Sequence, residues 1–191
     1  ERWKVVQGIL SALTLPKIEG EPLDAFAERV MKDSQEQARK AAEKGTAIHA
    51  AIEGFFRTGK AIEFQTEVTM TAAALLEKYK LQNWSAEKSF SSSLGYGCKV
   101  DLVSPEVVID FKTKEFFNTE KKLAWDEQAM QLAANRDATG FKNAKCANVF
   151  VSVNNPGLVH IHEWTEDELK RGWEMFQALL SYWQARTGHR P

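Results

Sequence analysis

The chain has 191 residues, of which 43% are hydrophobic and 27% are charged, and its formal net charge is −1. This composition is typical of a single folded domain over residues 1–191, and it excludes a disordered chain and a strongly basic protein that coats nucleic acid. The chain has no apolar run near the roughly 20 residues of a membrane span, and its two cysteines are too few for a disulfide framework or a four-cysteine iron–sulfur cluster.

The first part of the chain is predicted to be helical. We expect four helices, over about 3–13, 22–43, 46–57 and 68–80. Gly45 and Thr46 interrupt the second apolar pattern, so Thr46 is predicted to cap a separate third helix. This third helix is apolar almost all round, which is typical of a buried helix.

His49 and Glu53 lie one turn apart on this third helix and therefore share a face. A single histidine on a buried helix is more often a hydrogen-bonded core residue than a metal ligand. The helix alone leaves both interpretations open.

The rest of the chain alternates strands and helices. Strands are predicted over 83–91, 98–103, 107–111, 145–153 and 158–164, and helices over 125–136 and 166–186. Thr165 and Glu168 form a capping-box pattern before the last helix. The expected fold is α/β (α+β-like), with a central mixed sheet of about five strands flanked by helices. Its helical N-terminal part covers about 1–81 and its core about 82–191.

The central hairpin, GYGCKVDLVSPEVVIDFKTK, carries the charges that most need an explanation. Asp101 lies on its first strand, and Asp110 and Lys112 lie at the end of a β-branched run that is typical of a strand buried on both faces. An unpaired carboxylate in an apolar setting is very costly, and a divalent cation is a natural partner for two of them. Lys112 points to the same face as Asp110, where it can position a water or offset charge on a phosphate.

Two further sets of polar residues are less specific. Glu87 is predicted on the strand face opposite Trp84 and Phe90, either toward solvent or as a third carboxylate near the two aspartates. His160 and His162 share a face of one strand and would suit a metal, but a partly exposed strand face without a third ligand is the simpler interpretation.

With these elements in order, residues 45–153 resemble the PD-(D/E)xK nuclease superfamily, and within it the RecB-like exonuclease branch. The matching positions, in chain order, are Gly45-Thr46-x-x-His49, Glu87, Asp101, Asp110-x-Lys112 and Gln131. Two positions depart from the family pattern: Cys98 stands where a glycine is usual, and Asn135 replaces a tyrosine. The iron–sulfur cysteines of some members are absent.

The resemblance implies a restriction-endonuclease-like core that hydrolyses phosphodiester bonds with one or two Mg²⁺ or Mn²⁺ ions and no iron–sulfur cluster. The implied metal ligands are His49, Asp101, Asp110 and the backbone carbonyl of Phe111. The implied catalytic residues are Lys112, Asp110, Asp101, Glu87 and Gln131. In these roles Lys112 orients the attacking water or stabilises the transition state, Glu87 supports the metal site, and Gln131 holds Lys112 or a nucleotide.

The substrate expected from the resemblance is DNA, single- or double-stranded, attacked at its ends. The residues expected to contact it are Lys114, Gln131, Trp125 and Phe116. Stacking on unpaired bases and packing in the core remain alternatives for the aromatic residues Phe116, Phe117 and Trp125.

We therefore expect a metal-dependent DNA exonuclease in bacterial or phage recombination or repair, in the cytoplasm of a bacterial or phage-infected host cell. Its expected partners are DNA and a recombination protein such as a single-strand annealing protein, with no membrane. Two alternatives use the same fold: a catalytically silent module that binds DNA or protein, and a structure-dependent endonuclease. The retained Asp101, Asp110 and Lys112 favour an active enzyme, because a decayed site usually loses its costly charges first.

Overall fold

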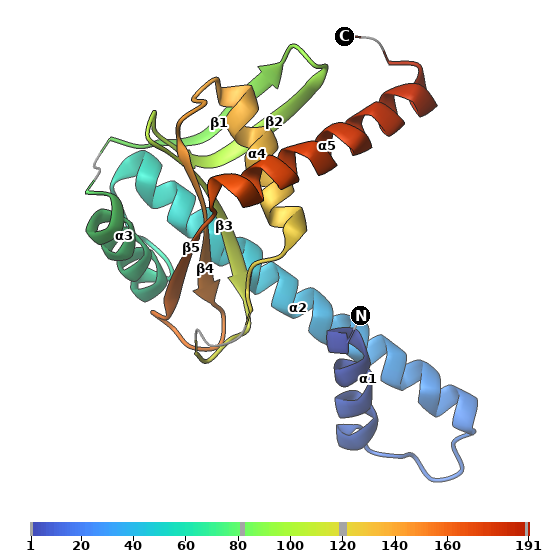
Figure 1. Cartoon of the computed structure of the whole chain (residues 1–191). Helices are drawn as coiled ribbons and strands as arrows, with labels where there is room; N and C mark the ends of the chain where they lie inside the picture. The colour runs from blue at the N-terminus through green and yellow to red at the C-terminus, as the bar shows by residue number, and fades with distance from the viewer. Residues whose placement is uncertain (1, 81–82, 119–121, 190) are drawn as a thin grey trace. The chain divides into compact units, whose positions relative to one another are not determined.

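A computed structural model of the chain describes residues 2–80, 83–118, 122–189 and 191 (Figure 1). The chain divides into two compact units, Glu1–Ala47 and Ile48–Pro191. That all 191 residues act as one domain therefore stays a prediction. No helix in the described part of the chain is long and apolar enough to cross a membrane.

The first unit contains helix α1 (Arg2–Thr14), a loop, and the first part of helix α2 (Leu23–Thr58). Arg29 on α2 donates to the Glu21 carboxylate at 2.6 and 2.7 Å and to the Pro16 carbonyl at 2.8 Å. One guanidinium therefore ties the loop to the helix that follows it.

Helix α2 runs without a break through Gly45 and Thr46, so the prediction of two separate helices here is wrong. The Thr46 hydroxyl donates to the Ala42 carbonyl at 3.0 Å, which is a bond to the preceding turn and not a cap on the following one. A glycine inside a helix costs only about 1 kcal/mol relative to alanine. The helix-forming residues on both sides outweigh that cost.

The second unit is built on a five-stranded mixed sheet in the order β1-β2-β3-β4-β5. The strands are β1 (Ser85–Ser92), β2 (Tyr96–Val103), β3 (Val107–Lys114), β4 (Lys145–Ser152) and β5 (Val159–Glu163). Strands β3 and β4 are parallel, and the other neighbouring strands are antiparallel. The predicted α/β class and the mixed sheet of about five strands are confirmed.

Helices cover both faces of this sheet (Figure 1). Helices α4 (Asp126–Thr139) and α5 (Glu166–Thr187) pack on one face, and helix α3 (Gln65–Tyr79) packs with the end of α2 on the other. The α4–α5 core includes Val108, Leu132, Phe150 and Leu169. The α2–α3 core includes Ile48, Ile52, Leu75, Ile109 and Phe111. Strand β3 is therefore buried on both faces, as its β-branched run predicts.

The predicted capping box at the start of α5 is confirmed. The Thr165 amide donates to the Glu168 carboxylate at 2.9 Å, and the Glu168 amide donates to the Thr165 hydroxyl at 3.3 Å. These bonds satisfy two amides that a helix N-terminus leaves without intrahelical partners.

Gly172 is where α5 approaches α4 most tightly. A Cβ atom at Gly172 would lie 2.8 Å from the carbonyl carbon and oxygen of Ala129, whereas a Cβ at Gly54 on α2 would meet nothing within 4 Å. We expect Gly172→Ala to lower the free energy of unfolding by about 1–3 kcal/mol, because backbone atoms cannot move aside. Gly54→Ala should leave it unchanged or raise it by up to about 1 kcal/mol, since alanine favours a helix. Urea denaturation of both variants tests this, and equal midpoints would contradict the close approach.

Cys146 on β4 is fully buried, and this burial raises the pKa of its thiol to about 12. Cys98 on β2 is only partly buried. Because the thiolate is the reactive form, we expect iodoacetamide at pH 8 to modify Cys98 in the folded protein and to leave Cys146 unmodified. Mass spectrometry should find both modified after unfolding in urea. Rapid labelling of Cys146 in the folded protein would show that β4 is open to solvent.

Candidate metal centre and active site

Strands β2 and β3 separate at the level of Asp101 and Asp110. They pair at Val103↔Val108 and Leu102↔Ile109. Two residues beyond Ile109 on β3, the Phe111 amide donates to Asp101 Oδ2 at 2.7 Å. A side chain thus satisfies an amide that faces the opening between the two strands.

The alternation of side chains along β2 changes phase at Asp101. Val100 packs in the α4–α5 core, but Leu102, two residues further on, packs in the α2–α3 core. Across from Asp101 on β1, between the pairs Ala86↔Leu102 and Lys88↔Val100, Glu87 has a φ of 58°, which is uncommon for a residue other than glycine. Strand irregularities of this kind often re-aim a side chain beside an active site. Here the Asp101 carboxylate approaches α2.

The same change of phase overturns one prediction. Trp84 packs against the α2–α3 core, whereas Phe90 packs against the α4–α5 core, so the two rings do not share a face of β1. The prediction assumed regular alternation through Glu87, which its left-handed backbone breaks.

Three side chains from α2 and β2 converge beside the opening. His49 Nε2 lies 3.0 Å from Glu53 Oε1 and 3.1 Å from Asp101 Oδ2. One potential ligand atom from each residue lies within 4.8 Å of the others. Burial alone would lower the pKa of His49, but the Asp101 and Glu53 carboxylates outweigh it and raise that pKa. Burial, together with the Asp101 charge, raises the pKa of Glu53.

The cluster of His49, Glu53 and Asp101 fits a divalent cation. His49 Nε2 is buried and has no hydrogen-bond partner of acceptable geometry among the described residues, although two carboxylate oxygens lie next to it. An imidazole nitrogen and carboxylate oxygens are ligands that divalent metals share in proteins. A cation would satisfy the nitrogen and offset the two negative charges.

Asp110 lies close to this cluster, and its carboxylate is on the face of the sheet that α4 and α5 cover. The residue is 3% exposed. Lys112 Nζ lies 2.8 Å from Oδ1 and 2.7 Å from Oδ2, and Gln131 Nε2 donates to Oδ1 at 2.8 Å. Burial raises the pKa of Asp110, and the negative charge of Asp101 adds to this, while the Lys112 ammonium opposes it. This buried carboxylate therefore has a cation and amide donors around it.

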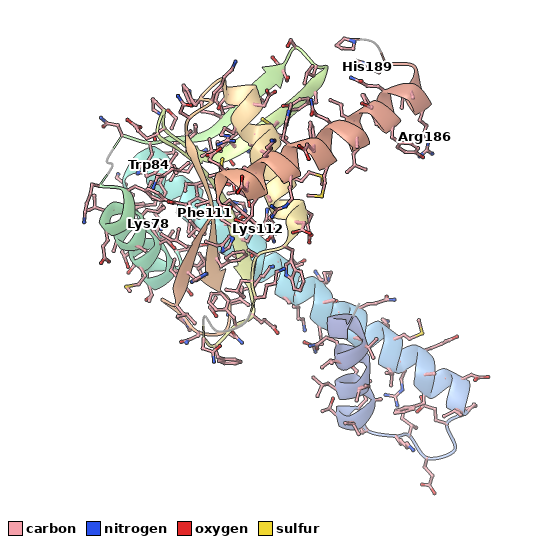
Figure 2. The ribbon with its side chains drawn as sticks, viewed as in Figure 1. Lys78, Trp84, Phe111, Lys112, Arg186 and His189 are labelled. Atoms are coloured by element: carbon pink, nitrogen blue, oxygen red, sulfur yellow. The ribbon has the colours of Figure 1, made fainter. Side chains whose placement is uncertain are left out.

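Lys112 and Gln131 also bond to each other. Lys112 Nζ donates to Gln131 Oε1 at 3.2 Å, so Asp110, Lys112 and Gln131 form a closed ring of hydrogen bonds. Lys112 lies over the central part of the sheet beside Phe111 (Figure 2). The structure thus brings together three residues that the sequence predicts from β3 and the helix after it.

Phe111 supports the cluster from the α2 side. Its ring is 1% exposed, stacks on Phe56 at a centroid distance of 6.3 Å, and meets the edge of His49 at 5.8 Å. The ring therefore limits how the imidazole can turn. That the Phe111 carbonyl binds a metal remains a prediction.

Glu87 on β1 lies opposite Asp101 on the neighbouring strand β2, and it forms an ion pair with Lys99. It is not one of the three residues that converge at His49. Its role as a supporting carboxylate remains a prediction.

The residues expected to contact nucleic acid differ in their exposure. Phe116 is 2% exposed and packs in the α4–α5 core, which is the packing alternative considered for its ring. Lys114 Nζ donates to the Leu123 carbonyl at 2.7 Å and lies 5.0 Å from the centre of the Phe150 ring. The Lys114 side chain therefore holds the segment that leads to α4.

Trp125 is the N-cap residue of α4 and is 47% exposed. Its amide donates to Gln128 Oε1 at 2.9 Å, and Lys122 Nζ lies 4.7 Å from the centre of its ring. Phe117 is 75% exposed. An exposed indole beside a lysine is a place where a base can stack, and Phe117 is a second exposed ring in the segment before it.

His160 and His162 do not gather a third ligand. The one group of three potential metal ligands found in the described chain is that of His49, Glu53 and Asp101. Burial lowers the pKa of both histidines, and the His162 ring meets the edge of Trp164 at 4.4 Å. This agrees with the simpler interpretation of the pair.

Two residues of the site were not predicted as functional. Glu53 was recognised as sharing a face with His49, and that i, i+4 spacing was the available signal. Asn148 Nδ2 donates to Asp110 Oδ2 at 2.6 Å from a fully buried position on β4. Its signal was a single amide inside the apolar run 146–151, because a buried polar residue is more informative than a buried apolar one.

Comparison with known proteins supports the fold. No protein-family profile matches the chain, and no curated protein is similar to it in sequence. A solved structure of a candidate exonuclease from Eubacterium rectale is similar with a TM-score of 0.53 and 11% identity, over 78% of this chain and 69% of that one. The structure of SSO0001 has 14% identity over 93% of this chain and 85% of that one, with a TM-score of 0.38. The chain therefore shares the fold of the Eubacterium rectale structure.

Proposed function

We propose that the chain is a metal-dependent deoxyribonuclease of the PD-(D/E)xK superfamily, in its RecB-like branch, and that it acts as an exonuclease. The observation that carries this proposal is the convergence of His49, Glu53 and Asp101 beside the ring formed by Asp110, Lys112 and Gln131. The similarity of fold to a candidate exonuclease supports the proposal, and so does the sequence resemblance carried by His49, Asp101, Asp110, Lys112 and Gln131. Bacterial or phage recombination or repair is the proposed setting.

The cluster would hold Mg²⁺ or Mn²⁺ through His49 Nε2 and the carboxylates of Glu53 and Asp101, with Asp110 as the neighbouring carboxylate. When bound, the ion supplies a water of lowered pKa and positive charge beside the scissile phosphate. Asp101 has a second task, because its Oδ2 also accepts the Phe111 amide. That bond fixes the carboxylate against rotation.

Lys112 is the residue best placed to act on the reacting atoms. Its ammonium is held by Asp110 and Gln131 and remains partly exposed, with 29% of its side chain open to solvent. Gln131 accepts a hydrogen bond from this ammonium at 3.2 Å and so helps to hold it in place. Lys112 can therefore orient the attacking water or stabilise negative charge on the phosphate.

The proposed substrate is DNA with an accessible end. Trp125 and Phe117 provide exposed rings for bases, with Lys122 beside Trp125 for a phosphate. Gln131 lies on the same helix that Trp125 caps, so one element carries both an active-site residue and a stacking residue. A single-strand annealing protein or a similar recombination protein is the proposed partner.

Glu53 tests the metal centre directly. Titration calorimetry with Mn²⁺ or Mg²⁺ should show Glu53→Gln lowering the affinity of the folded protein at least about tenfold, because it removes one of three ligands. The matched control is Glu77→Gln, at an exposed carboxylate on α3. Chelation by EDTA should lower the melting temperature of the wild-type protein and not that of a His49→Ala variant. Equal affinities for the Glu53 and Glu77 variants would remove Glu53 from the site.

Nuclease activity tests the proposal as a whole. End-labelled linear DNA and matching circles, single- and double-stranded, should be incubated with Mg²⁺, Mn²⁺ or EDTA. We expect metal-dependent loss of linear DNA with circles intact. Lys112→Ala should lower kcat by about 10²–10³-fold, the loss typical of removing one group that stabilises a transition state.

The matched control for this assay is Lys88→Ala, at an exposed lysine of β1, which should keep the wild-type kcat. Cleavage of circles would indicate an endonuclease. Absence of cleavage with every metal and DNA form would contradict the proposed activity and favour a binding module.

A further inference from the structure

Behind the Asp110 carboxylate, a line of buried polar groups continues into the α4–α5 core. Asn148 Nδ2 donates to Asp110 Oδ2 at 2.6 Å, and Trp164 Nε1 donates to Asn148 Oδ1 at 2.7 Å. Asn148 is 0% exposed and Trp164 is 7% exposed. The line therefore joins β3, β4 and the residue after β5, away from solvent.

The chemistry of the indole fixes the direction of this line. An indole N–H can only donate a hydrogen bond, whereas either end of an asparagine amide can face a given neighbour. The Asn148 atom that faces Trp164 must therefore be the oxygen. The amide NH₂ must then face Asp110, and a flip of the amide would leave both Trp164 and Asp110 with mismatched partners.

All the groups around the Asp110 carboxylate are donors. Asn148 donates to Oδ2, Gln131 donates to Oδ1, and the Lys112 ammonium reaches both oxygens. Bonds to both oxygens from different sides fix the plane of the carboxylate. Asn148 donates from its fully buried position on β4, whereas Gln131 donates from α4 and Lys112 from β3.

Packing alone does not explain an amide at position 148. Its neighbours along β4, Ala147 and Val149, are 0% exposed, and burying an amide without a partner costs several times the energy of a hydrogen bond. An apolar residue would fill this place without that cost. The two partners that satisfy the amide are a proposed active-site carboxylate and an indole N–H, whose acceptor among the described residues is Asn148.

We propose that Asn148 and Trp164 are positioning residues for Asp110: Trp164 holds the Asn148 amide in one orientation, and Asn148 holds the Asp110 carboxylate in the plane that the reaction needs. This inference rests on the proposed nuclease function. Neither residue touches the substrate or the metal, and both act through Asp110.

The first test needs neither metal nor DNA. The indole ¹H–¹⁵N signal of Trp164, assigned with Trp164→Phe, should shift in Asp110→Asn, because the substitution changes the acceptor at the far end of the line. The shift should disappear when Asn148→Ala is added, and the signal of Trp173 should not move in either case. If the chemical shift of the Trp164 indole is the same in the wild-type protein and in Asp110→Asn, the proposed hydrogen-bonded connection from Asp110 to Trp164 is wrong.

The second test separates positioning from stability. With saturating metal, Trp164→Phe keeps the aromatic ring and should lower kcat about fivefold, as expected for one lost hydrogen bond, with KM within twofold. Asn148→Asp replaces the donor by an oxygen and should lower kcat by about 10–100-fold, the effect typical of a partner behind a metal ligand. Near-UV circular dichroism identifies any variant that fails to fold, and Trp164→Phe then carries the test.

A double-mutant cycle gives the decisive comparison. If Trp164 acts only through Asn148, adding Trp164→Phe to Asn148→Ala should leave kcat unchanged, whereas independent effects would multiply and would overturn the proposal. Wild-type rates in active, folded single variants would overturn the positioning role alone. A wild-type protein that neither binds metal nor cleaves DNA would overturn the nuclease function and, with it, this role.

Discussion

The structure depends on one constraint: a carboxylate, that of Asp110, is buried at the centre of the sheet with 3% exposure. A buried charge without partners is very unfavourable, and its partners must come from several elements at once. Strand β3 itself supplies Lys112, α4 supplies Gln131, and β4 supplies Asn148. The parallel pairing of β3 with β4 sets Asp110 directly beside Asn148. The pairing of the two central strands therefore gives this carboxylate one of its partners, in addition to packing the apolar faces.

A second set of charges lies on the other side of the opening between β2 and β3. In the register that pairs Leu102 with Ile109, regular alternation would place Asp101 on the same face of the sheet as Asp110, where the two carboxylates would repel each other strongly. The change of phase at Asp101 instead turns it toward His49 and Glu53 on α2, and the Phe111 amide holds it there. The two groups thus remain close enough to affect each other's pKa, while each keeps its own partners. A cation between them would meet ligands from α2, β2 and β3.

Local patterns were sufficient for most of the fold. The β-branched run 107–111 and the capping box at Thr165 each identify an element that the structure contains. The errors occurred where tertiary packing overrides local preference. Gly45 resembles a helix break in the sequence, but α2 continues through it and buries Ile48 and Ile52 beyond it. Glu87 looks like part of a regular strand, but its left-handed backbone changes which side chains share a face. The contact of Asn148 with Asp110 could not be predicted from the sequence, because it arises from the pairing of β3 with β4 and not from any spacing along the chain.

The fold by itself does not establish an activity, since similar sheets with flanking helices serve unrelated functions. The residues of the site distinguish an enzyme from a binding module, because they are costly to bury. A module that only bound DNA or protein would be more stable with apolar residues at 110 and 148, because replacing buried polar groups by well-packed apolar ones is often neutral or stabilising. This chain instead keeps a buried aspartate, a lysine tied to it, and an imidazole nitrogen without a hydrogen bond beside two carboxylates. The buried aspartate and the imidazole nitrogen oppose stability, whereas the lysine offsets part of that cost; all three suit a reaction at a metal, which agrees with the proposed catalysis.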